Sequence, residues 1–288
     1  MSRMSGGTGG SIWDRERLVA PHGHTDKAWR VRTMFDAIAP TYELINTLAS
    51  AGQDRFWRRE MVRLAGVRSD DVLLDVACGT GDVVRVFAAG DRHGVRPSLI
   101  LGVDFSTNML RFAADRSGNA ARAEARGSSS GEREAAFLKA DALRLPIADH
   151  AVSIVTCAFG IRNFQDLDVG LGEMYRVLCP GGRAVILEFG VPTRPVLRHL
   201  YLCYATRLMP MLAAWISRDH TGAYRYLPRS VLSFPGSKMI ASRLQAAGFS
   251  RVSVHPLSWG IVAIHVAAKE GPAPPRGTGV NENPGSHS

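Results

Sequence analysis

An α/β fold built on a mostly parallel sheet is predicted by three features of this sequence. From residue 72 onward, short runs of β-branched and apolar residues alternate with helix-like stretches, which is typical of strands joined by crossover helices. The first run ends in the glycine-rich turn CGTGD at 78–82. Aspartates stand at the ends of the second and third runs. Because ligands bind beyond the carboxyl ends of strands in such sheets, these turns also predict where the functional site lies.

The expected elements alternate between strand and helix until the last two strands. Strands are expected at 72–77, 99–104, 136–140, 151–159, 183–189, 251–254 and 261–267. Helices are expected at 82–89, from 107 onward after a cap at Ser106, and at 166–178. The turn Pro180-Gly181-Gly182 is expected to launch the fifth strand. Only a few residues separate the last two strands, so they can pair antiparallel. Residues 27–65 are expected to form helices outside this alternation.

The composition of the ends predicts a single domain over residues 27–269. We expect residues 1–26 to be largely disordered, because the chain begins with a Gly/Ser-rich stretch. The tail at 270–288 is expected to be disordered for a similar reason, since it is rich in Pro, Gly, Asn and Ser without periodicity. A polar segment at 117–134 is expected to form a solvated insertion between two elements.

The formal net charge of +9 over 288 residues favours partners that carry phosphate. Nucleic acid and an anionic membrane surface both satisfy this condition. No zinc-finger, recognition-helix or RNA-binding aromatic signature is present, so a nucleic-acid-binding protein is the less favoured alternative. The four cysteines form no CxxC pair and the histidines do not cluster, so no metal site is expected.

The location expected from the sequence is the cytoplasm, with peripheral contact at the inner face of the membrane. The most apolar window, 199–216, is interrupted by Arg207 and Pro210 and does not suit a bilayer span. The first residues show neither an apolar signal segment nor the composition of a mitochondrial presequence.

A nucleotide-type cofactor is predicted at the glycine-rich turn. Gly79 and Gly81 allow the backbone to approach a ligand, and the amino end of a helix follows. A dinucleotide site would need a third glycine where Val84 stands, which argues against NAD or FAD. A carboxylate at Asp104 can accept both hydroxyls of a ribose. Asp141-Ala142 is placed to meet an adenine ring.

The glycine turn, the acid after strand two and the acid after strand three resemble the order found in Rossmann-like methyltransferases, whose cofactor carries a sulfonium and an amino acid rather than phosphates. Asp75 and Asp82 would then attract the ligand and not repel it. Taken singly, each aspartate could instead be a helix cap or a turn residue. The ordered set of glycine turn, acid after strand two and acid after strand three favours the cofactor site.

From residue 27 to about 268, the chain resembles the ubiquinone/menaquinone biosynthesis C-methyltransferases, the UbiE/MenG family. The CGTGD and PGG turns are shared by many methyltransferases, whereas FGIRN at 159–163 and YRYL at 224–227 are specific to this family. The resemblance also covers Phe35-Asp36, YELINTLASAGQDRFW at 42–57, MYRVL at 174–178, LEF at 187–189, Ser230, AGF at 247–249 and WGIVAIH at 259–265.

The resemblance implies a Rossmann-like class I methyltransferase, with a seven-stranded mixed sheet whose last strand is antiparallel. It implies S-adenosylmethionine as methyl donor, held by Thr80, Asp104 and Asp141-Ala142, and a demethylated polyprenyl quinol as acceptor. The chain departs from the family pattern at three positions. Ala158 replaces a serine, Asp54 a histidine and Glu43 an aspartate.

Arg162, Asn163 and Tyr42 are the candidate catalytic residues. Removing a proton from a quinol hydroxyl makes the ring carbon nucleophilic, so a group that stabilises the phenolate helps. Arg162 can stabilise that charge, and Asn163 can orient a water or the hydroxyl. Arg162 could instead form a structural ion pair with Asp166 or Asp168. Tyr42 could close over the ligands, or be a half-buried core aromatic.

An acceptor-covering helical insertion is expected at 196–216, where large apolar side chains recur at helical spacing. Core packing is the alternative explanation of the same pattern. Arg55, Arg59 and Arg63 recur every four residues and form one basic face of a helix. That face either is simply solvated or rests on anionic headgroups.

The predicted reaction is methylation of demethylmenaquinol to menaquinol. Within the enzymes, methylation of 2-polyprenyl-6-methoxy-1,4-benzoquinol for ubiquinone, or of another small aromatic acceptor, stays open. A catalytically silent scaffold is a further alternative, which donor binding would test. Prenyl length and oligomeric state, including a homodimer, are not determined by these features.

Overall fold

The computed structural model describes residues 11–14, 16–124, 135–208 and 221–271, apart from the side chains of 119–124, 208 and 224. One seven-stranded sheet lies at its centre, with the strand order β3-β2-β1-β4-β5-β7-β6. Its strands are β1 (Val72–Val76), β2 (Leu99–Asp104), β3 (Ala135–Lys139), β4 (Val152–Ala158), β5 (Leu178–Phe189), β6 (Arg251–Leu257) and β7 (Val262–Ala268).

The sheet is mixed as the sequence predicts. Strands β1 to β5 pair in parallel, whereas β7 is antiparallel to both β5 and β6. The predicted antiparallel pairing of the last two strands is therefore confirmed. Strand β5 begins earlier than expected, because Leu178 already pairs with Val152. The next pair along the strands joins Arg183 to Ile154, so the Pro-Gly-Gly turn is an irregularity within β5 and does not launch it.

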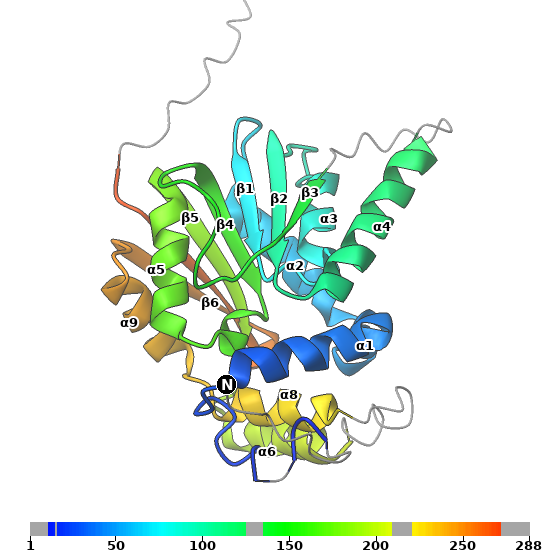
Figure 1. Cartoon of the computed structure of the whole chain (residues 1–288). Helices are drawn as coiled ribbons and strands as arrows, with labels where there is room; N and C mark the ends of the chain where they lie inside the picture. The colour runs from blue at the N-terminus through cyan, green and yellow to red at the C-terminus, as the bar shows by residue number, and fades with distance from the viewer. Residues whose placement is uncertain (1–10, 15, 125–134, 209–220, 272–288) are drawn as a thin grey trace, which may run out of the picture.

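Helices cover both faces of the sheet (Figure 1). They are α1 (Lys27–Ala49), α2 (Gln53–Ala65), α3 (Asp82–Ala89), α4 (Thr107–Glu124), α5 (Leu167–Val177), α6 (Pro195–Cys203), α8 (Ala223–Leu232) and α9 (Ser237–Ala246). Successive strand residues point to opposite faces, so Leu74 packs in the cluster with α5 and α9 while Leu73 packs in the cluster with α2 and α3.

Three helices gather at the carboxyl ends of the parallel strands. Figure 1 shows α1 crossing below these ends, with α8 and α6 beneath it. The short turns η1 (Ile161–Asn163), η2 (Tyr204–Leu208, with π-helical pairing) and η3 (Ser258–Gly260) complete this layer. The predicted helices before the sheet are confirmed as α1 and α2. The predicted covering insertion begins with α6 and η2, and residues 209–216 lie outside the described part of the chain.

The segment before α1 packs against the domain, although we expected disorder up to residue 26. Trp13 is fully buried, and its ring stacks on Tyr226 of α8 at a centroid distance of 4.3 Å. His22 bonds to the carbonyl of Ser230 at 3.0 Å. Trp13 is the apolar anchor of this segment, and the polar composition of its neighbours does not predict it. Residues 1–10 lie outside the described residues.

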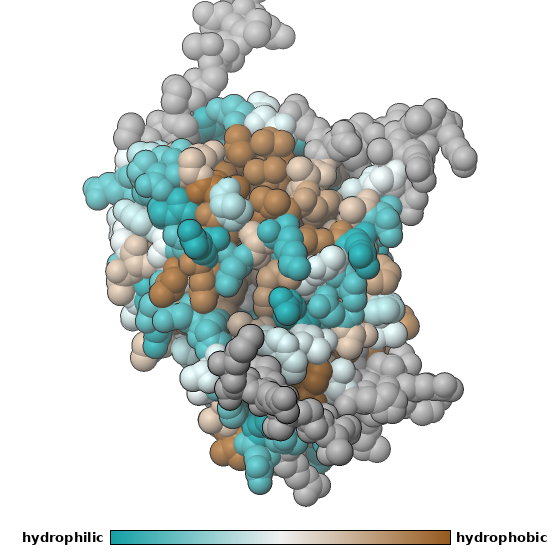
Figure 2. Space-filling model, in the orientation of Figure 1, coloured by the Kyte–Doolittle hydropathy of each residue, from teal (hydrophilic) through white to brown (hydrophobic). Residues whose placement is uncertain are grey.

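Between β3 and β4 a loop takes the place of a covering helix. Figure 2 is brown over the strands between α4 and α5, and Leu99 and Leu138 are 42% and 47% exposed. Residues 117–124 continue α4 and do not form the irregular insertion expected there. Residues 125–134 of that predicted insertion, and the predicted tail from 272 onward, lie outside the described residues. None of the helices in the described ranges is both long and apolar enough to cross a membrane.

Candidate functional site

The turn after β1 has the open backbone that the glycines predict. Gly79 and Gly81 have φ values of +55° and +79°, in the left-handed region that favours glycine. Nothing lies within 4 Å of the position that a Cβ on Gly79 would occupy. A Cβ on Gly81 would meet the Ala113 Cβ at 3.2 Å, so this glycine lets α4 approach the turn. The backbone at Gly79 is therefore free to meet a ligand.

Asp104, the last residue of β2, is hydrogen-bonded to this turn. Its Oδ2 accepts a hydrogen bond from the Gly79 N–H at 2.9 Å, and its Oδ1 accepts one from the Ser106 N–H at 2.8 Å. The side chain is buried, and burial raises its pKa to about 6 from a usual value of 3.8. Two amide donors thus fix the orientation of the carboxylate.

Two buried polar atoms beside the turn are without partners. Asp75 Oδ1 accepts a hydrogen bond from Thr156 Oγ1 at 2.7 Å. Asp75 Oδ2 and Thr80 Oγ1 make no hydrogen bond with any residue in the described ranges. Burial raises the pKa of Asp75 to about 7. Unpaired buried polar atoms are uncommon in folded proteins, and a ligand is one physical reason for them.

Asp82 does not contribute to this set, although we expected it to help attract the ligand. Its carboxylate forms ion pairs with Arg58 at 3.2 Å, Arg85 at 2.6 Å and Arg116 at 3.4 Å. Three guanidinium groups leave it neutralised at the junction of α2, α3 and α4.

A small cavity of about 50 Å³ joins Asp104 to the third strand and to the turn after β4. It is lined by Val76, Ala77, Asp104, Asp141, Ala142, Gly160, Asn163 and neighbouring residues. The structure thereby brings Asp104, Asp141 and Ala142 together. Asp141 is exposed, and its Oδ1 also accepts the Leu143 N–H at 2.9 Å, so it holds a turn as well as lining the cavity.

A larger cavity of about 350 Å³ lies on the other side of the turn at 161–163, among α1, α2, η2 and α8. Aromatic rings form much of its wall. Phe159 and Phe189 stack at a centroid distance of 4.3 Å, and Trp57 meets the Phe189 ring edge-on at 6.3 Å. Tyr42 and Arg162 also line this cavity. Apolar walls with few polar groups are typical of sites for small organic ligands.

Arg162 is a buried charge in the wall of this cavity, as are Asp54 and Arg58, and its partner lies on β5. Its Nη1 lies 2.7 Å from Glu188 Oε1, and their side chains are 2% and 1% exposed. Burial has the largest single effect and lowers the pKa of Arg162, but Glu188 together with Tyr42 and Tyr226 outweighs it and raises the pKa above its usual range. The alternative partners considered above were wrong, because Asp166 caps α5 and Asp168 pairs with Arg243. Glu188 was not predicted as a site residue. The feature that could have indicated it is its position as the lone acid in the apolar run AVILEF.

Asn163 faces the small cavity and does not line the large one. Its Nδ2 donates to the Phe159 carbonyl at 3.3 Å, and its Oδ1 accepts from the Tyr226 hydroxyl at 3.0 Å. The turn at 161–163 thus separates the two cavities, with Arg162 on one side and Asn163 on the other.

Tyr42 is half-buried at the wall of the large cavity. Its ring meets Phe35 edge-on at 5.6 Å, and burial raises the pKa of its hydroxyl. Tyr42 is thus a half-buried aromatic that packs on Phe35, its neighbour in α1, and it also lines the cavity that it was expected to close.

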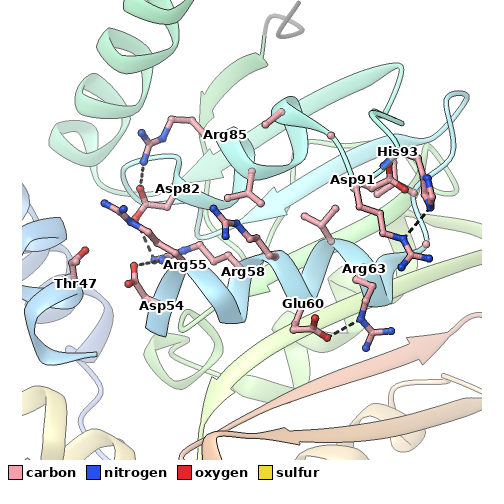
Figure 3. A pocket seen from close by; sticks show the side chains of 18 of the residues that line it. Thr47, Asp54, Arg55, Arg58, Glu60, Arg63, Asp82, Arg85, Asp91 and His93 are labelled. Atoms are coloured by element: carbon pink, nitrogen blue, oxygen red, sulfur yellow. Dashed lines mark hydrogen bonds and ion pairs between the residues drawn. The ribbon is translucent and has the colours of Figure 1, made fainter. Parts of the chain in front are cut away.

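A third hollow of about 800 Å³ opens between α2 and α3 (Figure 3). Arg55, Arg59 and Arg63 line it and are exposed, as the helical spacing predicts, and Arg63 pairs with Glu60 at 2.7 Å. Two of the positions that differ from the family pattern, Asp54 and Glu43, also line this hollow. Asp54 pairs with Arg58 at 2.5 Å, and Glu43 pairs with Arg85 at 3.3 Å. Both substituted acids therefore serve one ion-pair network. Within the described part of the chain, no three His, Cys, Asp or Glu side chains are grouped to hold a metal.

Known proteins are similar to this chain over most of its length. The family model described as the ubiE/COQ5 methyltransferase family matches residues 24–269. A demethylmenaquinone methyltransferase of Thermus thermophilus is 44% identical over 81% of this chain and 98% of its own length. The ubiquinone/menaquinone biosynthesis C-methyltransferase UbiE of Rubrivivax gelatinosus is 37% identical over 88% and 92%.

Solved structures share the fold at much lower identity. A SAM-dependent methyltransferase of Thermotoga maritima superposes with a TM-score of 0.53 and 15% identity, over 83% of this chain and 99% of that chain. This likeness shows the Rossmann-like class I fold. Since the family model covers most of the chain and the relatives match over most of their lengths, the chain belongs to the ubiE/COQ5 methyltransferase family.

Proposed function

We propose that this chain transfers a methyl group from S-adenosylmethionine to a ring carbon of a demethylated polyprenyl quinol, with demethylmenaquinol as the acceptor. The observation that carries the proposal is the buried Arg162 in an apolar, aromatic cavity adjacent to the Asp104 cavity. The names of the relatives support the choice of acceptor.

The donor fits the polar atoms around the glycine turn. S-adenosylmethionine supplies an electrophilic methyl group on a sulfonium when it is bound. Asp104 is oriented by two amides and would accept the ribose hydroxyls, and Asp141-Ala142 would meet the adenine. Asp75, Thr80 and the Gly79–Gly81 backbone would hold the amino-acid end, because Asp75 Oδ2 and Thr80 Oγ1 are the unpaired buried atoms there.

The large cavity suits a quinol ring attached to a prenyl chain. Aromatic rings form much of its wall, and in a largely apolar environment a fixed cation stabilises developing negative charge strongly. Arg162 would stabilise the phenolate formed when a ring hydroxyl loses its proton. The neighbouring ring carbon would then bond to the methyl group as the methyl–sulfur bond breaks, and the proton of that carbon would pass to the ring oxygen, which restores the aromatic quinol. Asn163 would orient the reacting groups from the other side of the turn, and Tyr42 would close the cavity.

The test is a methyl-transfer assay with radiolabelled donor under reducing conditions. Purified protein is offered short-chain demethylmenaquinol, the methoxy-benzoquinol precursor of ubiquinone, and a simple naphthol. We expect label in menaquinol, and loss of at least about a hundredfold in rate for Arg162→Ala, as for removal of an electrostatic stabiliser. Label only in another acceptor, or none in any quinol, would overturn the proposed reaction.

We further propose that α6 contacts an anionic membrane surface, from which the acceptor would enter. Val196 and Leu200 are 75% and 60% exposed, and the exposed Arg194 and Arg198 have no acidic partner among the described residues. Each basic residue near an anionic surface adds about 1 kcal/mol. Sedimentation with vesicles tests this: binding to anionic vesicles should exceed binding to neutral ones, and V196E/L200E should reduce both. Equal recovery of wild type and variant with anionic vesicles would contradict the contact.

A further inference from the structure

Two tyrosines of the covering segment face the acceptor cavity. Tyr201 on α6 and Tyr204 at the start of η2 both line it, together with Ala205. These positions are three and four residues apart, so they share one face of the helical segment. No residue of α6 itself is fully buried, and Leu200 next to Tyr201 is 60% exposed.

The hydroxyls of these two tyrosines differ in their bonding. The Tyr204 hydroxyl donates to the Ala49 carbonyl at 2.6 Å, which ties the covering segment to the end of α1. The Tyr201 hydroxyl makes no hydrogen bond with the residues that the structure describes. Tyr201 is half-buried and its hydroxyl keeps some exposure, so the hydroxyl is available to a ligand in the cavity that Tyr201 lines.

We propose that the Tyr201 hydroxyl binds a ring oxygen of the acceptor and, with Arg162, sets the orientation of the quinol in its cavity. This inference rests on the proposed function and assigns a role to a residue that neither the motifs nor the cofactor site identified. Tyr201 is a direct acceptor contact, whereas Tyr204 holds the covering segment in place.

The surroundings of Tyr201 make it a hydrogen-bond donor and not a base. Burial raises the pKa of its hydroxyl to about 12, while the nearby Arg162 guanidinium acts in the opposite direction. The group therefore keeps its proton at physiological pH.

The matched variants are Tyr201→Phe and Tyr204→Phe, each of which removes one hydroxyl and keeps the ring. Both are assayed with demethylmenaquinol and with the naphthol analogues that lack one or the other ring hydroxyl. For the wild type, removing the ring hydroxyl that Tyr201 contacts, which keeps its proton in the reaction, should lower acceptor kcat/KM by about tenfold, as for one lost hydrogen bond. In Tyr201→Phe the quinol itself should lose about that factor, and the discrimination between quinol and that analogue should nearly vanish.

Tyr204→Phe serves as the control for a structural effect. It should lower the thermal unfolding midpoint, because the tie to Ala49 is lost, while the discrimination between quinol and analogues stays that of the wild type. The KM for the donor should not change in Tyr201→Phe. If Tyr201→Phe keeps the wild-type discrimination between acceptors, the contact does not exist and the proposed reaction still stands. If wild type methylates no quinol, the proposed function fails first.

Discussion

The guanidinium of Arg162 lies 2.7 Å from the carboxylate of Glu188, and neither side chain is more than 2% exposed. Arg162 follows β4 and Glu188 stands near the end of β5, so the pair joins two neighbouring parallel strands where they meet the acceptor cavity. Removing two charges from water is costly, and a pair buried in this way is weak as a source of stability. Its value lies in holding one cation in place beside an apolar cavity.

Neutralising Glu188 should destabilise the fold strongly. In Glu188→Gln the buried Arg162 loses its counter-charge, and breaking such a pair typically costs about 3–5 kcal/mol. Urea unfolding monitored by circular dichroism measures the loss. Asp168→Asn is the matched control, because it breaks the pair with Arg243 at a carboxylate that is 64% exposed. Exposed pairs contribute at most about 1 kcal/mol. Equal losses in the two variants would contradict the assigned role of burial.

Thr80→Val should separate donor affinity from stability. Valine keeps the branched shape but lacks the hydroxyl, whose Oγ1 is buried without a partner in the described structure. Removing an unpaired buried hydroxyl does not lower the free energy of unfolding. Affinity for S-adenosylmethionine, measured by titration calorimetry, should fall about fivefold to tenfold, as for one lost hydrogen bond.

Thr156→Val provides the opposite case. Its Oγ1 donates to Asp75 Oδ1 at 2.7 Å, so its loss leaves a second oxygen of that carboxylate unpaired. This variant should lose about 1–3 kcal/mol of stability. A stability loss in Thr80→Val as large as in Thr156→Val would mean that the Thr80 hydroxyl has a partner after all.

Donor affinity should titrate in two steps as the pH falls. The pKa of Asp75 is raised to about 7 and that of Asp104 to about 6, in both cases mainly by burial. Protonation removes the charge that attracts the donor at Asp75 and an acceptor of the ribose hydroxyls at Asp104. Calorimetric titrations between pH 5 and pH 8 should show affinity falling through both values, with apparent pKa values that belong to the pair. In Asp104→Asn and in Asp75→Asn a single step should remain, and in Asp104→Asn it should lie at a lower pH than the upper wild-type step, because the charge of Asp104 helps raise the pKa of Asp75. A flat profile in the wild type would count against donor binding at these carboxylates.

The same shifts predict how stability depends on pH in the absence of donor. Both folded-state pKa values lie above the usual value of 3.8, so between about pH 4 and pH 7 the folded protein binds more protons than the unfolded chain. The free energy of unfolding must therefore fall as the pH rises through this window. Asp75→Asn should show a smaller fall and exceed the wild type in stability at pH 8. Urea unfolding at several pH values checks this, and a variant that is less stable than wild type at pH 8 would contradict it.

The parallel core and the glycine turn after β1 could be predicted from the sequence because their signals are local. A β-branched run followed by Gly79 and Gly81 specifies a strand and an open turn within a few residues. The order of acids after β2 and β3 then locates Asp104 and Asp141, because parallel strands end at one edge.

Other features depended on contacts that are distant in the chain and could not be predicted. Glu188 meets Arg162 across 26 residues, and Tyr226 meets Asn163 across 63. No local pattern states which acid will face a buried arginine, so the sequence suggested the nearby Asp166 and Asp168. The burial of Trp13 likewise could not be predicted from the composition near the amino terminus, because its stacking partner Tyr226 stands far along the sequence.

Trp13 should therefore be one of the most sensitive positions in the chain. Trp13→Ala leaves a cavity against Tyr226 and α1, and truncating a fully buried tryptophan typically costs about 3–5 kcal/mol. Trp29→Ala is the control, since Trp29 is 53% exposed and its truncation should cost under about 1 kcal/mol. Urea unfolding of both variants measures the difference. Because the Tyr226 hydroxyl holds Asn163 at the edge of the Asp104 cavity, Trp13→Ala should also weaken donor binding, whereas Trp29→Ala should not. If Trp13→Ala unfolds at the same urea concentration as wild type, residues 11–14 are not part of the folded domain.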